Sequence, residues 1–389
     1  MTEILRSDEI YLTELSEKDK AFDKHKAASL EIARLYGLDG NNGLKGFVHG
    51  SRTILFDNYE SRINQCGSWL KFWQTDNSFK LTDARFCKVP YCPMCQFRRS
   101  LKWRAKFLAE LPSIHEAFPT DVWAFLTLTQ RNCQLSDLRA NIKAMNDGWA
   151  RLTKLANFPF KGCIKALEVT RVWDWYDQNG QLLGRHGVKW WYEQFDKYKK
   201  HLKASNPKTW QAKPTDEVHP HFHVFGLVKA SYFTTGYIKQ AEWQQMWKQS
   251  LRVDYLPIVH IQRVKDKQSK QVIENDDLNS GMIKGICETL KYTIKEQDLL
   301  GSFCEDENVN SDWLKSLTEQ LYLLRRVEYK GVLKQFGKEV EKSLDNLIEI
   351  DEEKEQEPPE EGREVIAHWN NYLKRYCISV KEELETCNK

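Results

Sequence analysis

The sequence predicts an α+β fold, because segments with the composition of strands alternate with segments of helical periodicity in one continuous region. Residues 135–156 and 237–251 repeat apolar side chains with the period of an amphipathic helix. The segments rich in β-branched and aromatic residues, which favour strands, are 122–130, 161–173, 218–228 and 257–264. No internal repeat of the solenoid kind is present. One mixed domain therefore accounts for the middle of the chain.

Composition bounds the class of protein. The chain has 389 residues, of which 41% are hydrophobic and 29% charged, as expected for a soluble globular protein. No apolar run is long enough to span a membrane, and the N-terminal sequence lacks the apolar core of a signal peptide. We therefore expect a cytoplasmic protein without a membrane partner, in which the ten cysteines bind metal or pack and do not form disulfides.

Charge and composition also predict where segments begin and end. The stretch from Glu339 to Glu364 contains twelve acidic and three basic residues. The rest of the chain is therefore more basic than the net charge of +3 for the whole chain indicates. A basic body favours a polyanionic partner, whereas the acidic run with its two prolines favours a linker. The expected segments are an N-terminal helical segment (1–60), a cysteine-rich and basic segment (61–110), the main domain (115–337) with an insertion (174–216), the acidic linker (338–364) and a C-terminal helix (365–389).

Histidines alternate in the third predicted strand. His219, His221 and His223 lie two residues apart, and the two-residue period of a strand places their side chains on one face. Imidazoles at this spacing on a rigid strand can reach one divalent cation. The alternative is a half-buried strand with polar residues outside, but three of the ten histidines in the chain fall within these five residues.

A cysteine cluster lies upstream of the predicted strands. Cys87, Cys92 and Cys95 follow the spacing C-x4-C-x2-C, and Cys66 precedes them by twenty-one residues. Two thiolates of a C-x2-C motif can bind one ion, and a ligand from a distant loop completes the tetrahedron of a structural Zn²⁺ site. Cys66 is the candidate for this fourth ligand. The alternative is a group of buried free thiols.

A basic run follows the cysteines directly. A helix here would present cationic side chains to phosphates while Phe97, Trp103 and Phe107 pack inward or stack on bases. The alternative is a solvated basic face. The candidate DNA-binding residues are Arg98, Arg99, Lys102, Arg104 and Lys106.

These motifs together resemble a known family. His221-Phe222-His223 resembles the histidine-hydrophobic-histidine motif of HUH endonucleases, and the run HPHFHVFGLV resembles the Rep_1 family of rolling-circle plasmid replication initiators. FLTLTQRN (125–132) resembles the first motif of the family, ALEVTR (166–171) resembles the strand before the histidines, and the cysteine-rich stretch resembles a segment upstream of the catalytic motifs. The resemblance covers roughly residues 60–335 in the same order.

A tyrosine downstream of the histidine strand extends the resemblance. Glu288 and Tyr292 have i, i+4 spacing on a helix expected around Leu278 to Gln297, which by itself is more typical of ordinary packing than of catalysis. Tyr292-x-x-Lys295 resembles the third motif of single-tyrosine HUH enzymes, and Glu288 matches the glutamate one turn earlier. The resemblance implies that Tyr292 is the nucleophile of a site-specific nickase, assisted by Lys295, and that Glu288 is the general base that activates water.

The resemblance also implies a fold, a cofactor and partners. The fold is an antiparallel sheet flanked by helices, with a ferredoxin-like core, a central histidine strand and a tyrosine helix over its metal-bearing face. Mg²⁺ or Mn²⁺ would be held by His221, His223 and a third ligand, Glu168 or its rival His219.

The implied function is that of a plasmid replication initiator. Such a protein binds origin DNA, nicks its single-stranded form through a 5′-phosphotyrosine, and ends rolling-circle replication by strand transfer or hydrolysis. A host helicase and polymerase are expected partners. The alternatives are an HUH relaxase or transposase, and a zinc-dependent DNA-binding regulator without catalysis. Should Tyr292 have only a packing role, Tyr255 is the alternative nucleophile.

Overall fold

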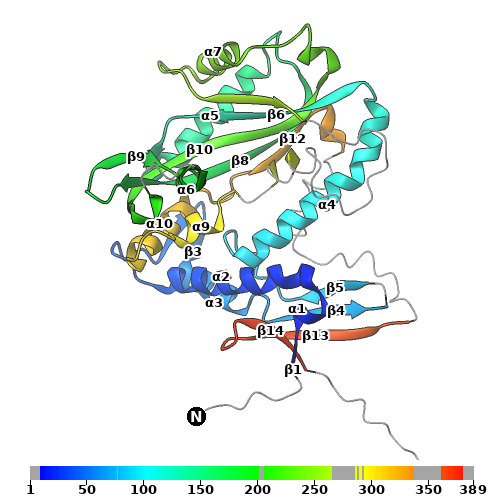
Figure 1. Ribbon diagram of the computed structural model, residues 1–389, viewed down its shortest axis with the longest axis vertical. Helices are drawn as coiled ribbons and strands as arrows, with labels where there is room; N and C mark the ends of the chain where they lie inside the picture. Colours follow the sequence, from blue (N-terminus) through cyan, green and yellow to red (C-terminus); the bar gives the residue numbers. More distant parts are fainter. Residues whose placement is uncertain are drawn as a thin grey trace, which may run out of the picture. The chain divides into compact units, whose positions relative to one another are not determined.

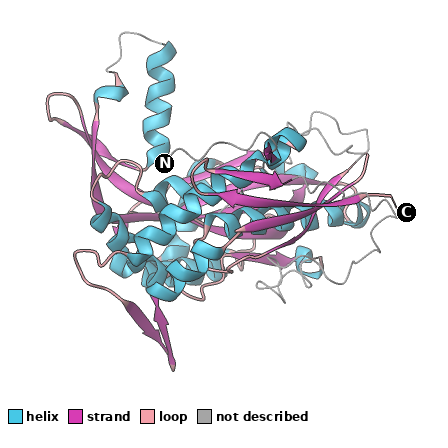
Figure 2. Cartoon of the chain, turned by 90° about the horizontal axis from the view of Figure 1, so that it is seen from below, coloured by secondary structure: helices cyan, strands magenta, loops and turns pink. Residues whose placement is uncertain are grey.

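The computed structural model describes residues 9–76, 78–200, 206–264, 285–286, 289–290, 293–336 and 361–379. The chain divides into two compact units, both drawn in Figure 1. The first unit draws on residues 1–37, 48–99 and 344–389, and the second on residues 38–47 and 100–343. Each combines helices with antiparallel strands, as the colours of Figure 2 show. The predicted α+β class is therefore confirmed.

The first unit is built on a five-stranded antiparallel sheet in the order β1-β14-β13-β4-β5. Its strands are β1 (Glu9–Tyr11), β4 (Trp69–Gln74), β5 (Phe79–Ala84), β13 (Arg363–Asn370) and β14 (Arg375–Ser379). Phe22 of helix α2 packs edge-on against Phe72 of β4, with ring centroids 6.4 Å apart. The other elements in this part of the chain are α1 (Leu12–Leu15), η1 (Glu17–Asp19), α2 (Lys20–Gly37), α3 (Phe56–Gln65) and the hairpin of β2 (Gly46–His49) and β3 (Arg52–Leu55).

The predicted C-terminal helix over residues 365–389 is wrong for the residues described there. Val365 and Ala367 are buried, whereas Glu364 and His368 are exposed, and this two-residue alternation is that of a strand. Pairing with β4, almost three hundred residues earlier in the chain, then determines the conformation. None of the strands of this sheet is predicted from the sequence, because they are short and most of their partners are remote in sequence.

The second unit contains a seven-stranded sheet whose main path is β11-β6-β10-β8-β12, with β7 beside β10 and β9 beside β8. The four predicted strands are confirmed as β6 (Asp121–Thr129), β8 (Phe160–Tyr176), β10 (Gln211–Lys229) and β11 (Val259–Arg263). The histidine strand β10 lies in the middle of this path. The further strands are β7 (Cys133–Gln134), β9 (Leu182–His186) and β12 (Val327–Gly331).

Helices cover both faces of this sheet (Figure 1). The predicted helices α5 (Leu138–Leu152) and α7 (Gln240–Leu251) are confirmed and lie together on one face. Helix α4 (Pro93–Ala117) begins in the first unit, and its residues from Ser100 onward belong to the second. Phe107 of α4 packs against Trp123 of β6 and Phe225 of β10, so α4 covers the other face. The remaining helices are η2 (Leu135–Asp137), α6 (Val188–Lys200), η3 (Pro207–Thr209), η4 (Ala230–Phe233), α9 (Glu296–Leu300), α10 (Glu307–Gln320) and η5 (Val332–Gln335).

The helix expected around Leu278 to Gln297 is described only in part. Gly285, Ile286 and Thr289 are helical, but the chain bends at Thr293 and Ile294. A Cβ on Gly285 would lie 3.1 Å from the ring of Phe225, so this segment lies on the same face of the sheet as α4. The helix prediction is wrong for residues 293–295, which are not helical and precede α9 at Glu296; there the backbone carbonyl of Thr293 accepts a hydrogen bond from the N–H of Val169 on β8.

No helix in the described ranges combines the length and the apolar character that crossing a membrane requires.

We predict that Gly226→Ala destabilises the second unit. Gly226 lies in β10, where an added Cβ would come within 2.6 Å of the carbonyl oxygen of Gly162 and 2.5 Å of the Cβ of Cys163. Overpacking of this kind costs about 1–3 kcal/mol, which a lower urea midpoint at unchanged m-value would reveal. Gly236→Ala is the control, because its nearest neighbour would lie 3.5 Å away. Equal midpoints for the two variants would contradict the prediction.

Candidate active site and metal centres

The register of the central strands brings a carboxylate to the histidines. β10 pairs with β8 antiparallel, and His221 lies directly opposite Glu168. Cross-strand partners lie on the same face of a sheet, so Glu168 joins His221 and His223 on the face that α4 covers further along. The candidate ligand atoms of these three residues all lie within 4.8 Å of one another.

Glu168 is the centre of this group. Its Oε2 lies 2.7 Å from Nε2 of His223 and 3.2 Å from Nε2 of His221, and its Oε1 lies 3.2 Å from Nζ of Lys295. The residue is only 6% exposed. Burial raises the pKa of the Glu168 carboxyl, but the hydrogen bonds to both histidines and the charge of Lys295 outweigh burial and hold the pKa well below its usual range. The carboxylate is therefore ionised at neutral pH.

The other ring nitrogens of the two histidines have partners of their own. Nδ1 of His221 lies 3.4 Å from the backbone oxygen of His219, and Nδ1 of His223 lies 3.3 Å from Oγ1 of Thr127 on β6. A carbonyl oxygen can only accept, so Nδ1 of His221 carries the proton of its hydrogen bond. Nε2 of His221 faces the Glu168 carboxylate, to which it donates; a bound metal ion would replace that hydrogen bond and take the Nε2 lone pair, while Nδ1–H keeps the carbonyl of His219.

His219 lies apart from this group. Its Nδ1 contacts Oδ1 of Asn132 at 3.0 Å, and burial lowers its pKa to about 4. The rings of His219 and His221 are 5.5 Å apart. Of the two rivals for the third ligand, the structure brings Glu168 together with His221 and His223 and leaves His219 outside.

Lys295 comes from the segment that follows Tyr292 in the sequence. Thr293 is bound through its carbonyl to the N–H of Val169 at 2.8 Å, and Lys295 is the N-cap residue of α9 in an extended conformation. Lys295 therefore reaches Glu168 from a bend and not from the helix that the sequence predicts. Glu288, Tyr292 and the rest of that predicted helix other than residues 285–286, 289–290 and 293–297 lie outside the described residues.

A further acidic residue near the Glu168–His221–His223 group is not predicted from the sequence. Asp298 of α9 is 1% exposed and accepts a hydrogen bond from the backbone N–H of Arg171, and its Oδ1 has no partner among the described residues. Burial raises its pKa to about 7, although Lys295 opposes the shift. Nothing in the local sequence EQDLL distinguishes Asp298 from an exposed acid, because its burial depends on the docking of α9.

The alternative tyrosine, Tyr255, has a defined environment. Its Oη accepts a hydrogen bond from the backbone N–H of Arg131 at 3.1 Å, and the guanidinium carbon of Arg131 lies 4.0 Å from the ring centroid. Arg131 also escaped the sequence analysis, although it belongs to the FLTLTQRN motif.

The four candidate zinc ligands meet in the first unit. Sγ of Cys66 lies 3.6 Å from Sγ of Cys92 and of Cys95, and Sγ of Cys87 lies 3.6 Å from that of Cys95. A disulfide would require about 2.05 Å, whereas a tetrahedron with Zn–S bonds of about 2.3 Å has edges of about 3.8 Å. All four cysteines are buried. The donor set and its spacing therefore fit a tetrahedral metal ion.

The surroundings favour negative charge on Cys92, whereas hydrogen bonds between the thiols raise the pKa of Cys66 and burial raises the pKa of Cys87. Although burial raises the pKa of the Cys92 thiol, hydrogen bonds from the neighbouring thiols and from Ser29 outweigh it and lower the pKa. Lys26 is buried beside them, with Nζ donating to the backbone oxygens of Cys66 at 2.7 Å and Asn64 at 3.0 Å. Burial lowers the pKa of Lys26, and thiolate charge raises it. An ammonium at this position offsets part of the charge of a four-thiolate site.

The candidate DNA-binding residues lie on α4, as predicted. Trp103 stacks on Tyr329, with ring centroids 5.9 Å apart, and Phe107 packs against the sheet. The aromatic side chains therefore point inward. The five basic residues Arg98, Arg99, Lys102, Arg104 and Lys106 are partly buried and do not form a fully exposed basic face.

The insertion is also largely folded. Within residues 174–216, Trp175 is buried and packs against Trp191 of α6 and against Phe303.

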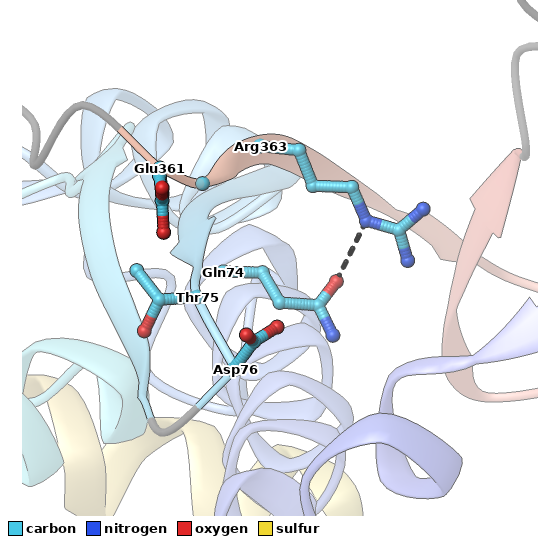
Figure 3. Close-up of a pocket in the computed structure, with 6 residues that line it drawn as sticks. Gln74, Thr75, Asp76, Glu361 and Arg363 are labelled. Carbon is cyan, nitrogen blue, oxygen red and sulfur yellow. Dashed lines mark hydrogen bonds between the residues drawn. The ribbon is translucent and has the colours of Figure 1, made fainter.

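A hollow in the first unit is lined by none of the residues of the two candidate metal groups. It is lined by polar residues at the ends of β4 and β13, where Nε of Arg363 donates to Oε1 of Gln74 at 2.9 Å (Figure 3). None of the residues that line it is a predicted site residue.

Comparison with known proteins points to one family. The Rep_1 model, described as a replication protein, matches residues 78–377. A "Protein rep" of Bacillus amyloliquefaciens is 33% identical over 330 residues, which cover 82% of this chain and 84% of the relative. A "Protein rep" of Streptococcus pneumoniae is 28% identical over 371 residues, which cover 94% and 93%. A "Replication protein" of Staphylococcus aureus is 28% identical over 268 residues, which cover 67% and 92%. No solved structure matches the chain.

We predict that replacing both His221 and His223 by alanine abolishes binding of a divalent ion at Glu168. One carboxylate cannot hold such an ion alone once both imidazoles are lost. The measurement is the loss of free Mn²⁺ signal in electron paramagnetic resonance during a titration. His260→Ala is the matched control, because His260 is exposed on β11 and outside the group. Unchanged Mn²⁺ binding by the double variant would remove the assignment.

Proposed function

This chain belongs to the Rep_1 family of replication proteins, and on that premise we propose that it is a plasmid replication initiator that nicks single-stranded origin DNA through Tyr292. The observation that carries the proposal is the Glu168–His221–His223 group, which contacts Lys295 three residues after Tyr292. Sequence-specific binding to the double-stranded origin precedes the nick. A host helicase then opens the duplex ahead of a polymerase that extends the free end, and strand transfer or hydrolysis terminates the cycle.

The proposed catalytic domain is of the HUH type with a ferredoxin-like core. It is supported by the antiparallel sheet with β10 at its centre, by helices on both faces, and by two histidines whose Nε2 atoms converge on Glu168. We assign the metal at this group as Mg²⁺ or Mn²⁺, since a carboxylate and two imidazoles leave positions open for phosphate oxygens. When bound, the ion polarises the scissile phosphate and stabilises the charge that develops on it.

Tyr292 performs the cleavage in this proposal. Its phenolic oxygen attacks phosphorus and forms the phosphotyrosine bond as the bond from phosphorus to the 3′ oxygen breaks. The phenol gives up its proton, and the departing 3′ oxygen gains one to become the primer hydroxyl. An unperturbed phenol has a pKa of about 10, so a cation near Tyr292 favours the reactive phenolate. Lys295 is the candidate cation, because its ammonium is already at Glu168.

Two anchors near Tyr292 support this assignment. The next residue, Thr293, is hydrogen-bonded to Val169, which itself follows Glu168. Lys295 contacts Glu168 directly. The sequence neighbours of the proposed nucleophile are thus tied to the strand that carries the proposed metal ligand.

Glu288 completes the cycle as a general base. It removes a proton from water, which attacks the phosphotyrosine and releases the 5′ phosphate and Tyr292. A hydrolytic end avoids the need for a second tyrosine.

The four-cysteine group is proposed as a structural Zn²⁺ site. Three observations support it. The distances between the sulfur atoms are close to the edge length of a tetrahedron of four thiolates around Zn²⁺, the four cysteines are buried, and Lys26 is buried beside them. The basic residues of α4 that follow it are proposed to contact origin phosphates, together with the lysine-rich insertion.

We expect Tyr292→Phe to abolish covalent adduct formation, because the variant lacks the only oxygen that attacks while keeping the ring. The assay is incubation with Mn²⁺ and a labelled single-stranded oligonucleotide that carries the origin nick site, followed by denaturing electrophoresis in SDS. Tyr255→Phe is the matched control and should still form the adduct. An adduct with Tyr292→Phe would move the nucleophile elsewhere, and no adduct with the wild-type chain would favour a DNA-binding regulator.

Glu288→Ala has a different expected outcome from Tyr292→Phe. The adduct should form at close to the wild-type level, because nucleophile and metal ligands remain, but it should persist, because water is no longer activated. In cells the displaced DNA should run past one plasmid length, which gel analysis of replication products detects. Normal termination by Glu288→Ala would assign Glu288 to packing.

For the cysteine site we predict about one tightly held zinc per chain, measured by elemental analysis of dialysed protein. Replacing Cys92 and Cys95 by serine should remove the zinc and expose residues 61–110 to proteolysis, because metal binding and folding are coupled. Cys133→Ser, at a cysteine without cysteine neighbours, is the control and should keep its zinc. Carefully purified wild-type protein without zinc would reject the site.

A further inference from the structure

The face of the sheet that carries the histidines continues beyond β6. Thr129 is the cross-strand partner of His221 and Thr127 that of His223, so the odd-numbered residues of β6 share the face of the histidines. Thr127 confirms this placement by its contact with Nδ1 of His223. Arg131 comes two residues after the end of β6 and is exposed. The next residue, Asn132, contacts His219 at 3.0 Å, so this stretch remains beside the histidine strand.

Arg131 is held in one orientation by Tyr255. The guanidinium lies over the tyrosine ring at 4.0 Å, and the backbone N–H of the same arginine donates to the tyrosine Oη at 3.1 Å. Within the described ranges, no carboxylate forms an ion pair with Arg131 and no group accepts a hydrogen bond from its guanidinium. Stacking uses the face of the guanidinium and leaves the N–H groups at its edge available.

The loop that supplies Tyr255 also exposes apolar surface. Leu256 is 50% exposed and Ile258 is 65% exposed. Ile258 is fixed beside β6, because its carbonyl accepts hydrogen bonds from both the N–H and the Oγ1 of Thr129. A cation with free donors next to exposed aliphatic side chains has the chemistry of a nucleotide-binding surface, in which phosphate and base are recognised separately.

We propose that Arg131, oriented by Tyr255, binds a backbone phosphate of single-stranded DNA adjacent to the metal-bound one, with Leu256 and Ile258 offering surface to the base. This inference rests on the proposed function and adds a subsite to it. A planar guanidinium binds two phosphate oxygens at once. Two residues along a strand span about 7 Å, so Arg131 reaches a neighbouring phosphate and sets which phosphate meets the metal group.

The test measures binding apart from cleavage. A fluorescein-labelled oligothymidylate is titrated with the full chain in EDTA, and anisotropy is recorded at several salt concentrations. Arg131→Gln should weaken binding about fivefold and lower the salt slope by about 0.7, the value for one phosphate contact on single-stranded nucleic acid. Arg131→Lys should recover part of the affinity, because charge returns without the planar fork. Tyr255→Leu should weaken binding about threefold and Tyr255→Phe by less, because phenylalanine keeps the ring under the guanidinium but loses the hydroxyl that accepts from the backbone N–H of Arg131.

Lys143→Gln is the matched control for charge. Lys143 is exposed on α5, over the opposite face of the sheet, and pairs with Asp147, so its loss should leave affinity unchanged. In parallel, an oligonucleotide containing 5-iododeoxyuridine is photocrosslinked, and we expect the crosslinks within residues 252–258. Equal affinities for Arg131→Gln and Lys143→Gln, or crosslinks only outside that loop, would overturn the subsite. A selective loss with Arg131→Gln in a protein that forms no adduct with Mn²⁺ would retain the subsite and reject the nicking reaction.

Discussion

A buried negative charge organises the candidate active site. Glu168 is held inside the sheet, and an unpaired carboxylate there would be strongly unfavourable. Its two oxygens are matched by His221 and His223 from β10 and by Lys295 from the bend before α9. Removing one partner of such a buried pair costs on the order of 3 kcal/mol. The same electrostatic requirement therefore holds the sheet register in place and draws the segment after Tyr292 onto β8.

The sequence predicted the parts of this site that depend on local period. The alternation of His219, His221 and His223 placed them on one face, and the spacing of Cys87, Cys92 and Cys95 identified a metal-binding pattern. The first follows from the two-residue period of a strand and the second from the short loop of a C-x2-C motif. Each of these features is determined within a single short segment of the chain. The four strands and two helices of the second unit were predicted for the same reason, because each carries a clear period of its own.

What sequence reasoning missed depends on partners that are remote in the chain. Whether Glu168 or His219 completes the group is decided by the register of β8 against β10, which no local pattern reveals. The local sequence around Asp298 is that of a surface acid, and only the docking of α9 buries its side chain. The local sequence around Arg131 is that of a loop, and only the fold brings the ring of Tyr255 against its guanidinium. The strands of the first unit were not predicted from the sequence for a similar reason. β13 forms a strand because it pairs with β4 on one side and with β14 on the other.

The order of strands in the first unit has a consequence for how the chain is made. β13 and β14 lie between β1 and β4 in the sheet, although they are the last described strands to be synthesised. On the ribosome, all strands described for the second unit are available before the sheet of the first can close. The unit that holds the four-cysteine group therefore completes its sheet only after residues 363–379 have been synthesised. A chain cut short after residue 343 keeps the strands around Glu168 but lacks the middle of the other sheet, so the first unit cannot close its sheet until β13 and β14 have been made.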